Sequence, residues 1–314
     1  MSSSLPFHNP MPYALCRSFI MMFNVSIGIM AHNEEANIGR LLQAVLDQKF
    51  AHGHLIEIMV VASGCTDHTE EIVRKCREKD PRIRLLSQPS REGKASAINL
   101  FLGHASGDIV ILESADTVPE QGTLDRLIAP FEDSEIGMTG ARPIPVNRKD
   151  NFIGFTVHLM WTLHHKIALL TPKLGELVAF RNFVSQIPHD TAVDEASIEA
   201  IVREAGFRLR YVPEAVVSNK GPETIRDFIK QRRRIAAGHK NLTRSQNYTV
   251  STSSPLKILV TLAREHSWGL KSTIWTLGAI GLEMIGRGLG YYDHYIKKKN
   301  PFVWDVARST KDLG

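Results

Sequence analysis

Short apolar segments alternate with amphipathic segments along the first third of the chain. The apolar segments cover residues 25–30, 56–62, 83–87 and 108–114, and their length and β-branched content predict strands buried on both faces. Residues 34–48, 69–79 and 94–104, which lie between them, carry apolar positions at helical spacing. This alternation predicts βαβ units, and therefore an α/β fold with a mainly parallel central sheet flanked by helices.

Each predicted strand is followed by polar residues. The four segments read "AHNEE", "SGCTD", "QPSREGK" and "ESADT" in chain order. Because the carboxyl ends of parallel strands meet at one edge of a sheet, ligands of such folds bind there. The pattern therefore predicts a polar ligand site made by these four strand ends.

Asp116 in "ESADT" allows two interpretations. A carboxylate at this place in the fold can hold Mg²⁺ or Mn²⁺, because these hard cations prefer oxygen ligands and share them with substrate phosphates. Alternatively, Asp116 is the N-cap of a helix that begins in "VPEQGTLDRLI", since aspartate is a favoured capping residue. Spacing alone does not decide between them.

The second half of the chain is predominantly helical in pattern. Residues 151–170 have apolar and aromatic residues at helical spacing, and an arginine-rich helix follows Pro222. Residues 272–292 approach membrane-spanning length, but Glu283 and Arg287 interrupt the apolar run. We interpret residues 255–314 as helices lying in a membrane interface, with the lysines of "YIKKKNPFVW" facing anionic headgroups. The alternative is a helix pair packed on the preceding domain.

Composition narrows the function further. The chain has 314 residues and a formal charge of +5, with acidic residues spread throughout, so charge does not indicate a nucleic-acid partner. The three cysteines lack metal-binding spacing, which favours a reducing compartment without structural zinc.

The apolar run "FIMMF" is too short for a secretory signal, and we interpret residues 1–23 as an N-terminal extension. His158, His164 and His165 form no metal template, and we expect them at an interface or membrane surface.

Six motifs, in order, resemble those of inverting family 2 glycosyltransferases with the GT-A fold. They are "VSIGIMAHNEEANIGRLLQAV", "VVASGCTDHTEEIV", "REGKASAIN", "ESADTVPE", "VDEASIEAIVREAGFRLRYVPEAVV" and "QRRRIAAGH". The last resembles the QxxRW signature of membrane-associated members. The resemblance covers about residues 24–243. It implies a GT-A domain over 24–245, with a nucleotide-sugar half (24–120) and an acceptor half (121–245), followed by the helical region 255–314.

The resemblance also implies residue roles. Asp116 corresponds to the metal-binding aspartate of the family's DxD motif, which favours its interpretation as a ligand of Mg²⁺ or Mn²⁺. The residues expected at the donor nucleotide are Ala31, Asn33, Glu34, Ser63, Lys94, Ser114, Ala115 and Asp116. The family's catalytic Glu-Asp pair falls on Asp194 and Glu195, with Glu195 at the base position, although either carboxylate could accept the proton.

The acceptor side is implied in the same way. Gln231 and Arg234 match the Gln and Arg of QxxRW, where they would contact the diphosphate or acceptor, and Ile235 replaces the tryptophan. Glu176 and Arg181 match a loop beside the acceptor site. The alternative for the arginine run is a solvated or lipid-facing helix surface.

These matches imply transfer of a sugar from a nucleotide-diphospho-sugar to a lipid-linked or glycan hydroxyl, with inversion, at the cytoplasmic membrane surface. UDP is the default nucleotide, and GDP stays open because Ala62 and Ser63 replace the acidic pair that often reads uracil. Ser114 replaces the first aspartate of DxD. These departures keep one alternative open, a non-catalytic nucleotide-binding membrane scaffold.

Overall fold

The protein is described by a computed structural model, which places residues 22–251, 255–265 and 269–298. The predicted N-terminal extension falls largely outside these residues. The strands are β1 (Phe23–Ala31), β2 (Gly53–Ser63), β3 (Ile83–Gln88), β4 (Ile109–Ser114), β5 (Thr117–Pro119), β6 (Ile136–Pro145), β7 (Val178–Arg181) and β8 (Arg208–Asn219). The helices are α1 (Ile38–Leu46), α2 (Thr69–Lys79), α3 (Lys94–Leu102), α4 (Thr123–Ile128), the 3₁₀ helix η1 (Ala129–Glu132), α5 (Phe152–Leu170), α6 (Asp194–Glu204), α7 (Ile225–Gln246), α8 (Pro255–Glu265) and α9 (Leu270–Tyr295).

The described strands form one mixed sheet in the order β3-β2-β1-β4-β7-β6-β8-β5. Strands β3, β2, β1 and β4 form a parallel run, and β6 is parallel to β8. Strand β7 runs antiparallel between β4 and β6, and β5 runs antiparallel to β8 at the edge. The predicted α/β class with a mainly parallel sheet is confirmed.

Apolar side chains cover both faces of this sheet. One core joins the strands to α1, α2 and α4, and the other joins them to α3 and α6. Successive residues of a strand serve opposite cores, as Ile29 and Met30 do in β1. Gly28 lets α3 come close, because a Cβ there would lie 2.5 Å from the ring of Phe101. Burial on both faces explains why the strands read as continuous apolar runs.

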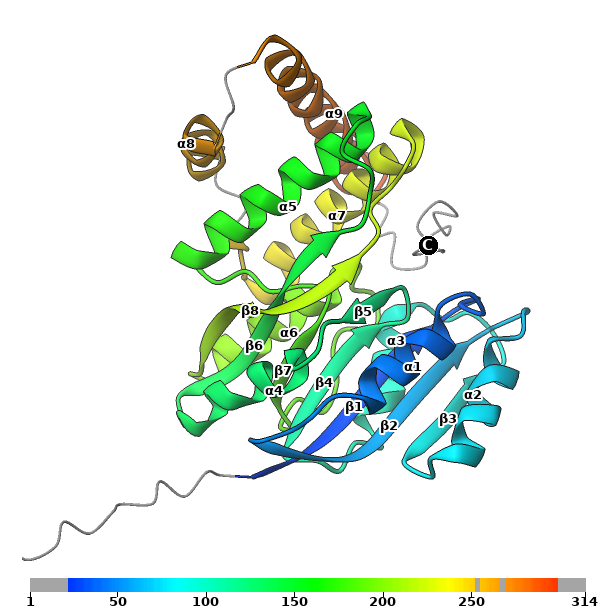
Figure 1. Cartoon of the computed structure of the whole chain (residues 1–314). Helices are drawn as coiled ribbons and strands as arrows, with labels where there is room; N and C mark the ends of the chain where they lie inside the picture. Colours follow the sequence, from blue (N-terminus) through cyan, green and yellow to red (C-terminus); the bar gives the residue numbers. More distant parts are fainter. Residues whose placement is uncertain (1–21, 252–254, 266–268, 299–314) are drawn as a thin grey trace, which may run out of the picture.

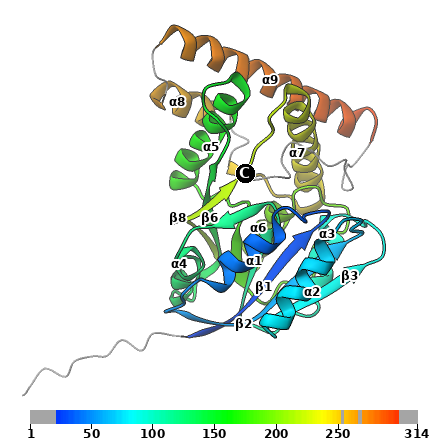
Figure 2. The ribbon, with the colours of Figure 1, turned by 45° about the vertical axis from the view of Figure 1, so that its right-hand side comes forward.

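Helices α5, α7, α8 and α9 gather at one end of the sheet (Figures 1 and 2). Helix α9 packs closely on α7, because Gly286 faces the Cβ atom of Arg232 and Gly290 faces Ala236. Two ion pairs cross this contact. Arg232 donates to both oxygens of Glu283 at 2.6 and 2.8 Å, and Arg233 donates to both oxygens of Asp293. Glu283, which interrupts the apolar run of α9, therefore faces α7.

The opposite side of α9 is apolar and exposed. Leu270, Ile274 and Leu277 are 82%, 58% and 64% exposed, and the same stripe continues through Ile285, Tyr292, Tyr295 and Ile296. We call these seven residues the α9 stripe. Helix α9 is thus packed on the domain along one side, as the alternative interpretation expected, and its other side is apolar and exposed. Its position in a membrane interface stays a prediction. No helix among the placed residues is long and apolar enough to cross a bilayer.

Candidate active site

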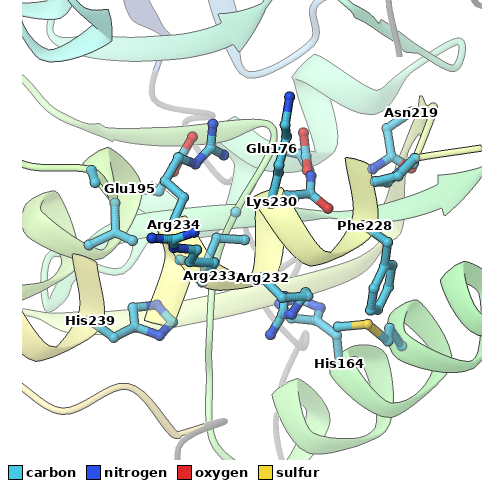
Figure 3. Close-up of a pocket in the computed structure, with 18 of the residues that line it drawn as sticks. His164, Glu176, Glu195, Asn219, Phe228, Lys230, Arg232, Arg233, Arg234 and His239 are labelled. Carbon is cyan, nitrogen blue, oxygen red and sulfur yellow. The ribbon is translucent and has the colours of Figure 1, made fainter. Parts of the chain in front are cut away.

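A cavity of about 1260 Å³ opens at the carboxyl ends of β1, β2 and β4 and extends toward α5, α7, α8 and α9. Ordinary small-molecule pockets have volumes of roughly 300–1,000 Å³. The cavity therefore has room for more than one substrate. Figure 3 shows some of its walls, with Glu176 and Glu195 on one side of the arginines of α7 and His164 and His239 on the other.

Asp116 lies in the turn between β4 and β5 and lines this cavity. The next helix, α4, starts seven residues later at Thr123, and its N-cap is Gly122. Asp116 is thus not the cap of that helix, and this alternative is wrong. A short strand, β5, occupies part of the segment that the sequence pattern assigned to the helix start.

Lys94, the first residue of α3, bridges to the first two residues of α6. Its Nζ atom lies 2.8 Å from Oε1 of Glu195 and 3.8 Å from Oδ2 of Asp194. Burial acts to raise the pKa of Glu195, but the ammonium group of Lys94 outweighs it and holds that pKa below its ordinary value. Burial raises the pKa of Asp194, whose Oδ1 atom has no hydrogen-bond partner among the placed residues. The two predicted catalytic carboxylates therefore differ in proton affinity.

Glu176 reaches the same cavity from a strained backbone. Its φ of 65° lies in the left-handed region, which a residue with a side chain adopts at a cost. Burial and the negative charges of Asp116 and Glu195 raise its pKa to about 7. Glu113, near the carboxyl end of β4, is a second buried acid, and burial raises its pKa to about 8. This end of the sheet thus gathers more carboxylates than it can hold fully ionised without a bound cation or a proton.

Helix α7 brings its arginine run to the cavity. Gln231, Arg232, Arg233 and Arg234 all line it. Burial lowers the pKa of Arg234, and the charges of Asp194, Glu195, Glu176 and Asp116 oppose that effect. Arg232 and Arg233 also pair with α9. The interpretation of the run as a solvated or lipid-facing surface is wrong for Arg232, whose side chain is 15% exposed, whereas the side chain of Arg233 stays 38% exposed.

Most of the residues expected at the donor line the cavity. Ala31, Glu34, Ser63, Lys94 and Ser114 do so. The Oγ atom of Ser63 is buried there without a hydrogen-bond partner among the placed residues, so it is available to a ligand.

Three predicted residues do not line the cavity. Asn33 lies on the surface, bonded to Thr66, and Ala115 is buried in the core. Arg181 donates instead to the backbone carbonyls of Phe131, Ile136 and Asp133. The physical reason is strand direction: β7 is antiparallel to β4, so Val178 pairs with Leu112 near the site while Arg181 pairs with Ile109 at the other end.

Sequence reasoning missed other cavity residues. Asn219, at the end of β8, lines the cavity and hydrogen-bonds with Glu176. His164 was expected at an interface or membrane surface. It forms part of the cavity wall, and burial lowers its pKa to about 3. Its Nδ1 atom has no hydrogen-bond partner among the placed residues. The polar end of β8 was the available signal for Asn219, whereas nothing in the helical pattern distinguishes His164 from its neighbours.

The placed residues do not form a ready-made metal site of three or more His, Cys, Asp or Glu side chains. The donor chemistry nevertheless fits a hard cation, because Asp116 and Glu176 are carboxylates of the same cavity and the charge of Asp116 raises the pKa of Glu176. Mg²⁺ and Mn²⁺ sites commonly rely on one or two carboxylates plus substrate phosphates.

The chain belongs to glycosyl transferase family 2, whose model matches residues 26–198. It is similar to the probable glycosyltransferase YdaM of Bacillus subtilis, with 26% identity over 69% of this chain and 55% of that protein. It is also similar to poly-beta-1,6-N-acetyl-D-glucosamine synthase of Staphylococcus aureus, with 27% identity over 74% of this chain and 59% of that protein. The chain thus spans little more than half the length of these relatives.

Solved structures share the fold. A mannosyltransferase from Pyrobaculum calidifontis, in complex with GDP-Man and Mn²⁺, has a TM-score of 0.62 at 20% identity, with 88% of each chain covered. Glucosyl-3-phosphoglycerate synthase from Mycobacterium tuberculosis, in complex with Mn²⁺, UDP and phosphoglyceric acid, has a TM-score of 0.51 at 20% identity, with 71% and 78% covered. The predicted GT-A fold is confirmed, and so is the predicted membership of a glycosyltransferase family.

Proposed function

We propose that this glycosyltransferase transfers a sugar with inversion from a nucleotide-diphospho-sugar to a lipid-linked or glycan acceptor. The observation that carries the proposal is the meeting of Lys94, Glu195, Asp194, Arg234 and Asp116 in one cavity. Such a site offers cationic donors for a diphosphate beside carboxylates for an acceptor hydroxyl. A non-catalytic nucleotide-binding scaffold would need the cationic donors but not the carboxylates for an acceptor hydroxyl.

Glu195 acts as the base in this proposal. Its side chain is 22% exposed, whereas that of Asp194 is 4% exposed, so an acceptor hydroxyl reaches Glu195 more easily. The ion pair with Lys94 makes Glu195 a weak base in the empty site. A bound diphosphate competes for Lys94, and the proton affinity of Glu195 then rises because Asp194 is still beside it.

The displacement follows from these positions. Glu195 accepts the proton of the acceptor hydroxyl, and the oxygen attacks the anomeric carbon from the face opposite the nucleotide. The bond from that carbon to the diphosphate breaks, and its electrons go to the phosphate oxygen. Arg234 and Lys94 stabilise the developing negative charge. Asp116, with Glu176 nearby, would hold Mg²⁺ or Mn²⁺, which supplies further positive charge at the diphosphate when bound.

The nucleotide is UDP or GDP. The two solved structures named above contain GDP-Man and UDP respectively, each with Mn²⁺, and the hydroxyl of Ser63 suits either base. The test is incubation of the full chain with Mn²⁺, a membrane lipid extract and each of UDP-glucose, UDP-N-acetylglucosamine and GDP-mannose, followed by mass spectrometry. A new glycosylated product from one donor, lost in Glu195→Gln, supports the proposal. Donor consumption by neither protein contradicts it.

We propose that the protein lies on the cytoplasmic face of a membrane, with α9 along the bilayer surface. The α9 stripe supports the contact of α9 with a bilayer. Cationic and aromatic side chains accompany the stripe: Lys271 lies 4.3 Å from the ring centre of Trp275, and Lys297 lies 5.3 Å from that of Tyr292. Apolar contact and anionic headgroups together bind such a surface. Leu277→Glu should reduce cosedimentation with phosphatidylglycerol vesicles, while Leu170→Glu, exposed on α5 away from the stripe, should not. Equal binding by both variants contradicts this placement.

A further inference from the structure

The cavity has a second, apolar part beyond the arginines of α7. Helix α5 contributes Met160, Trp161 and Leu163 to it, and α8 contributes Ile258, Leu259 and Leu262. Helix α9 closes it with Ala279, Ile280 and Met284. These nine side chains, which we call the apolar chamber, come from three helices outside the strand-end site. They offer a ligand contact area but few hydrogen-bonding groups.

We propose that the apolar chamber binds the hydrocarbon chain of the acceptor, so that the acceptor is a long-chain lipid with an anionic polar head. This inference rests on the proposed function, because it assigns the acceptor of the same site. A free glycan is a poor occupant, since its hydroxyl groups would lose water without gaining partners from apolar walls. A hydrocarbon chain gains free energy from the same walls in proportion to the area it buries.

The chamber is continuous with the catalytic groups. The same cavity is lined by Asp194, Glu195 and Asp116 at its polar end. Lys173 and Lys230 also line it, and they provide positive charge for an anionic head. The Nδ1 atom of His164 is buried in the wall without a partner among the placed residues, and low proton affinity keeps that imidazole neutral. A lipid can therefore place its head at the acids and its chain among α5, α8 and α9.

The chamber also reaches the protein surface where a lipid would enter. Leu259 and Met284 line the cavity and are nevertheless 62% and 69% exposed. They lie on α8 and α9, where Leu259 has the exposed Val260 beside it and Met284 lies next to Ile285 of the α9 stripe. A chain could thus pass from a bilayer into the chamber along these exposed apolar side chains.

The test is isothermal titration of the full chain with butyl, octyl and dodecyl phosphate, each below its critical micelle concentration. Each methylene that enters an apolar site improves affinity roughly threefold to fourfold. We therefore expect octyl phosphate to bind at least about tenfold more tightly than butyl phosphate. Equal affinities across the series would overturn the proposal.

Three variants locate the binding, two in the chamber and one control outside it. Ile258→Glu places a charge in the chamber and should abolish the dependence on chain length. Val260→Glu is the matched control, because Val260 lies on the same helix, is 41% exposed and does not line the cavity. Met284→Glu repeats the test at an exposed position that does not endanger folding. Equal losses in Ile258→Glu and Val260→Glu would mean adsorption on the surface of α8 and would refute the chamber.

Parallel titrations with UDP and GDP in the presence of Mn²⁺ separate the two proposals. Nucleotide binding without dependence on chain length would contradict the lipid acceptor and leave the transfer reaction in place. Dependence on chain length without nucleotide binding would establish the chamber and contradict the proposed donor.

Discussion

Lys94 and Glu195 form an ion pair with 2.8 Å between Nζ and Oε1, although 101 positions separate them in the chain. Lys94 starts α3 and Glu195 is the second residue of α6, and both helices pack on the same face of the sheet. The pair therefore joins the half expected to bind the donor to the half expected to bind the acceptor. Because a diphosphate and Glu195 compete for the same ammonium group, donor binding and activation of the base are coupled.

Replacement of Glu195 should slow the transfer step and leave nucleotide binding nearly unchanged. Glu195→Gln keeps the shape of the side chain but removes its ability to accept a proton. We expect kcat to fall by roughly 10²–10⁴-fold, the usual contribution of a general base, with nucleotide affinity nearly unchanged. Rates measured with saturating donor, beside a calorimetric titration of the same variant, check this. An active Glu195→Gln protein would exclude Glu195 as the base.

The role of Asp194, the carboxylate beside Glu195, is tested by the pH–rate profile of the Asp194→Asn variant. In our account Asp194 raises the proton affinity of Glu195 once Lys94 turns to the diphosphate. Removal of its negative charge should lower the pKa of Glu195, so the acidic limb of the pH–rate profile should move to lower pH. The measurement is kcat against pH for wild type and variant. A profile that keeps its position while the rate collapses would assign the base role to Asp194 instead.

The contact between α7 and α9 depends on Glu283. Glu283→Ala leaves Arg232 and Arg287, which both donate to it at 2.6 Å, without their shared acceptor. We expect a loss of about 1–3 kcal/mol in the free energy of unfolding. Glu70→Ala is the control, because the exposed pair of Glu70 with Arg74 should contribute at most about 1 kcal/mol. Denaturant unfolding of both variants measures the difference, and similar losses would contradict it.

The same acid gives stability a dependence on pH. Burial acts to raise the pKa of Glu283, but Arg232 and Arg287 hold it below the ordinary value of 4.5. A carboxyl with a lowered pKa stabilises the folded state above the unfolded pKa, and the contribution disappears as pH falls through the folded pKa. Wild type should therefore lose its advantage over Glu283→Ala below about pH 4.5. A difference that is constant with pH would refute this.

Glu113 should give the stability of the folded protein the opposite dependence on pH. Its pKa is raised to about 8 by burial, so between 4.5 and 8 the folded protein binds a proton that the unfolded chain has released. Stability then falls as pH rises through this window. Glu113→Gln keeps the neutral form at every pH, and its advantage in Tm over wild type should grow from pH 5 to pH 8. An advantage that does not change across this range would contradict the raised pKa.

The first half of the fold and much of the donor site could be predicted from the sequence, because each apolar run continues directly into the polar residues that it positions. The expected helix over 69–79 coincides with α2. The residues that were wrongly predicted or missed depend on strand direction and helix packing, which the sequence pattern does not reveal. The pattern around Arg181 does not reveal that β7 is antiparallel, and the arginine run of α7 does not reveal which guanidinium groups meet α9. The apolar chamber depends on how three helices pack, so His164 in its wall had no local signal.

Asp116 should help to bind a nucleotide diphosphate together with a divalent cation. Isothermal titration of wild type and Asp116→Ala with UDP and with GDP, each with and without Mn²⁺, measures this role. We expect wild type to bind one nucleotide only in the presence of Mn²⁺, and Asp116→Ala to lose that binding. Equal affinity of the two proteins for that nucleotide in the presence of Mn²⁺ would contradict it.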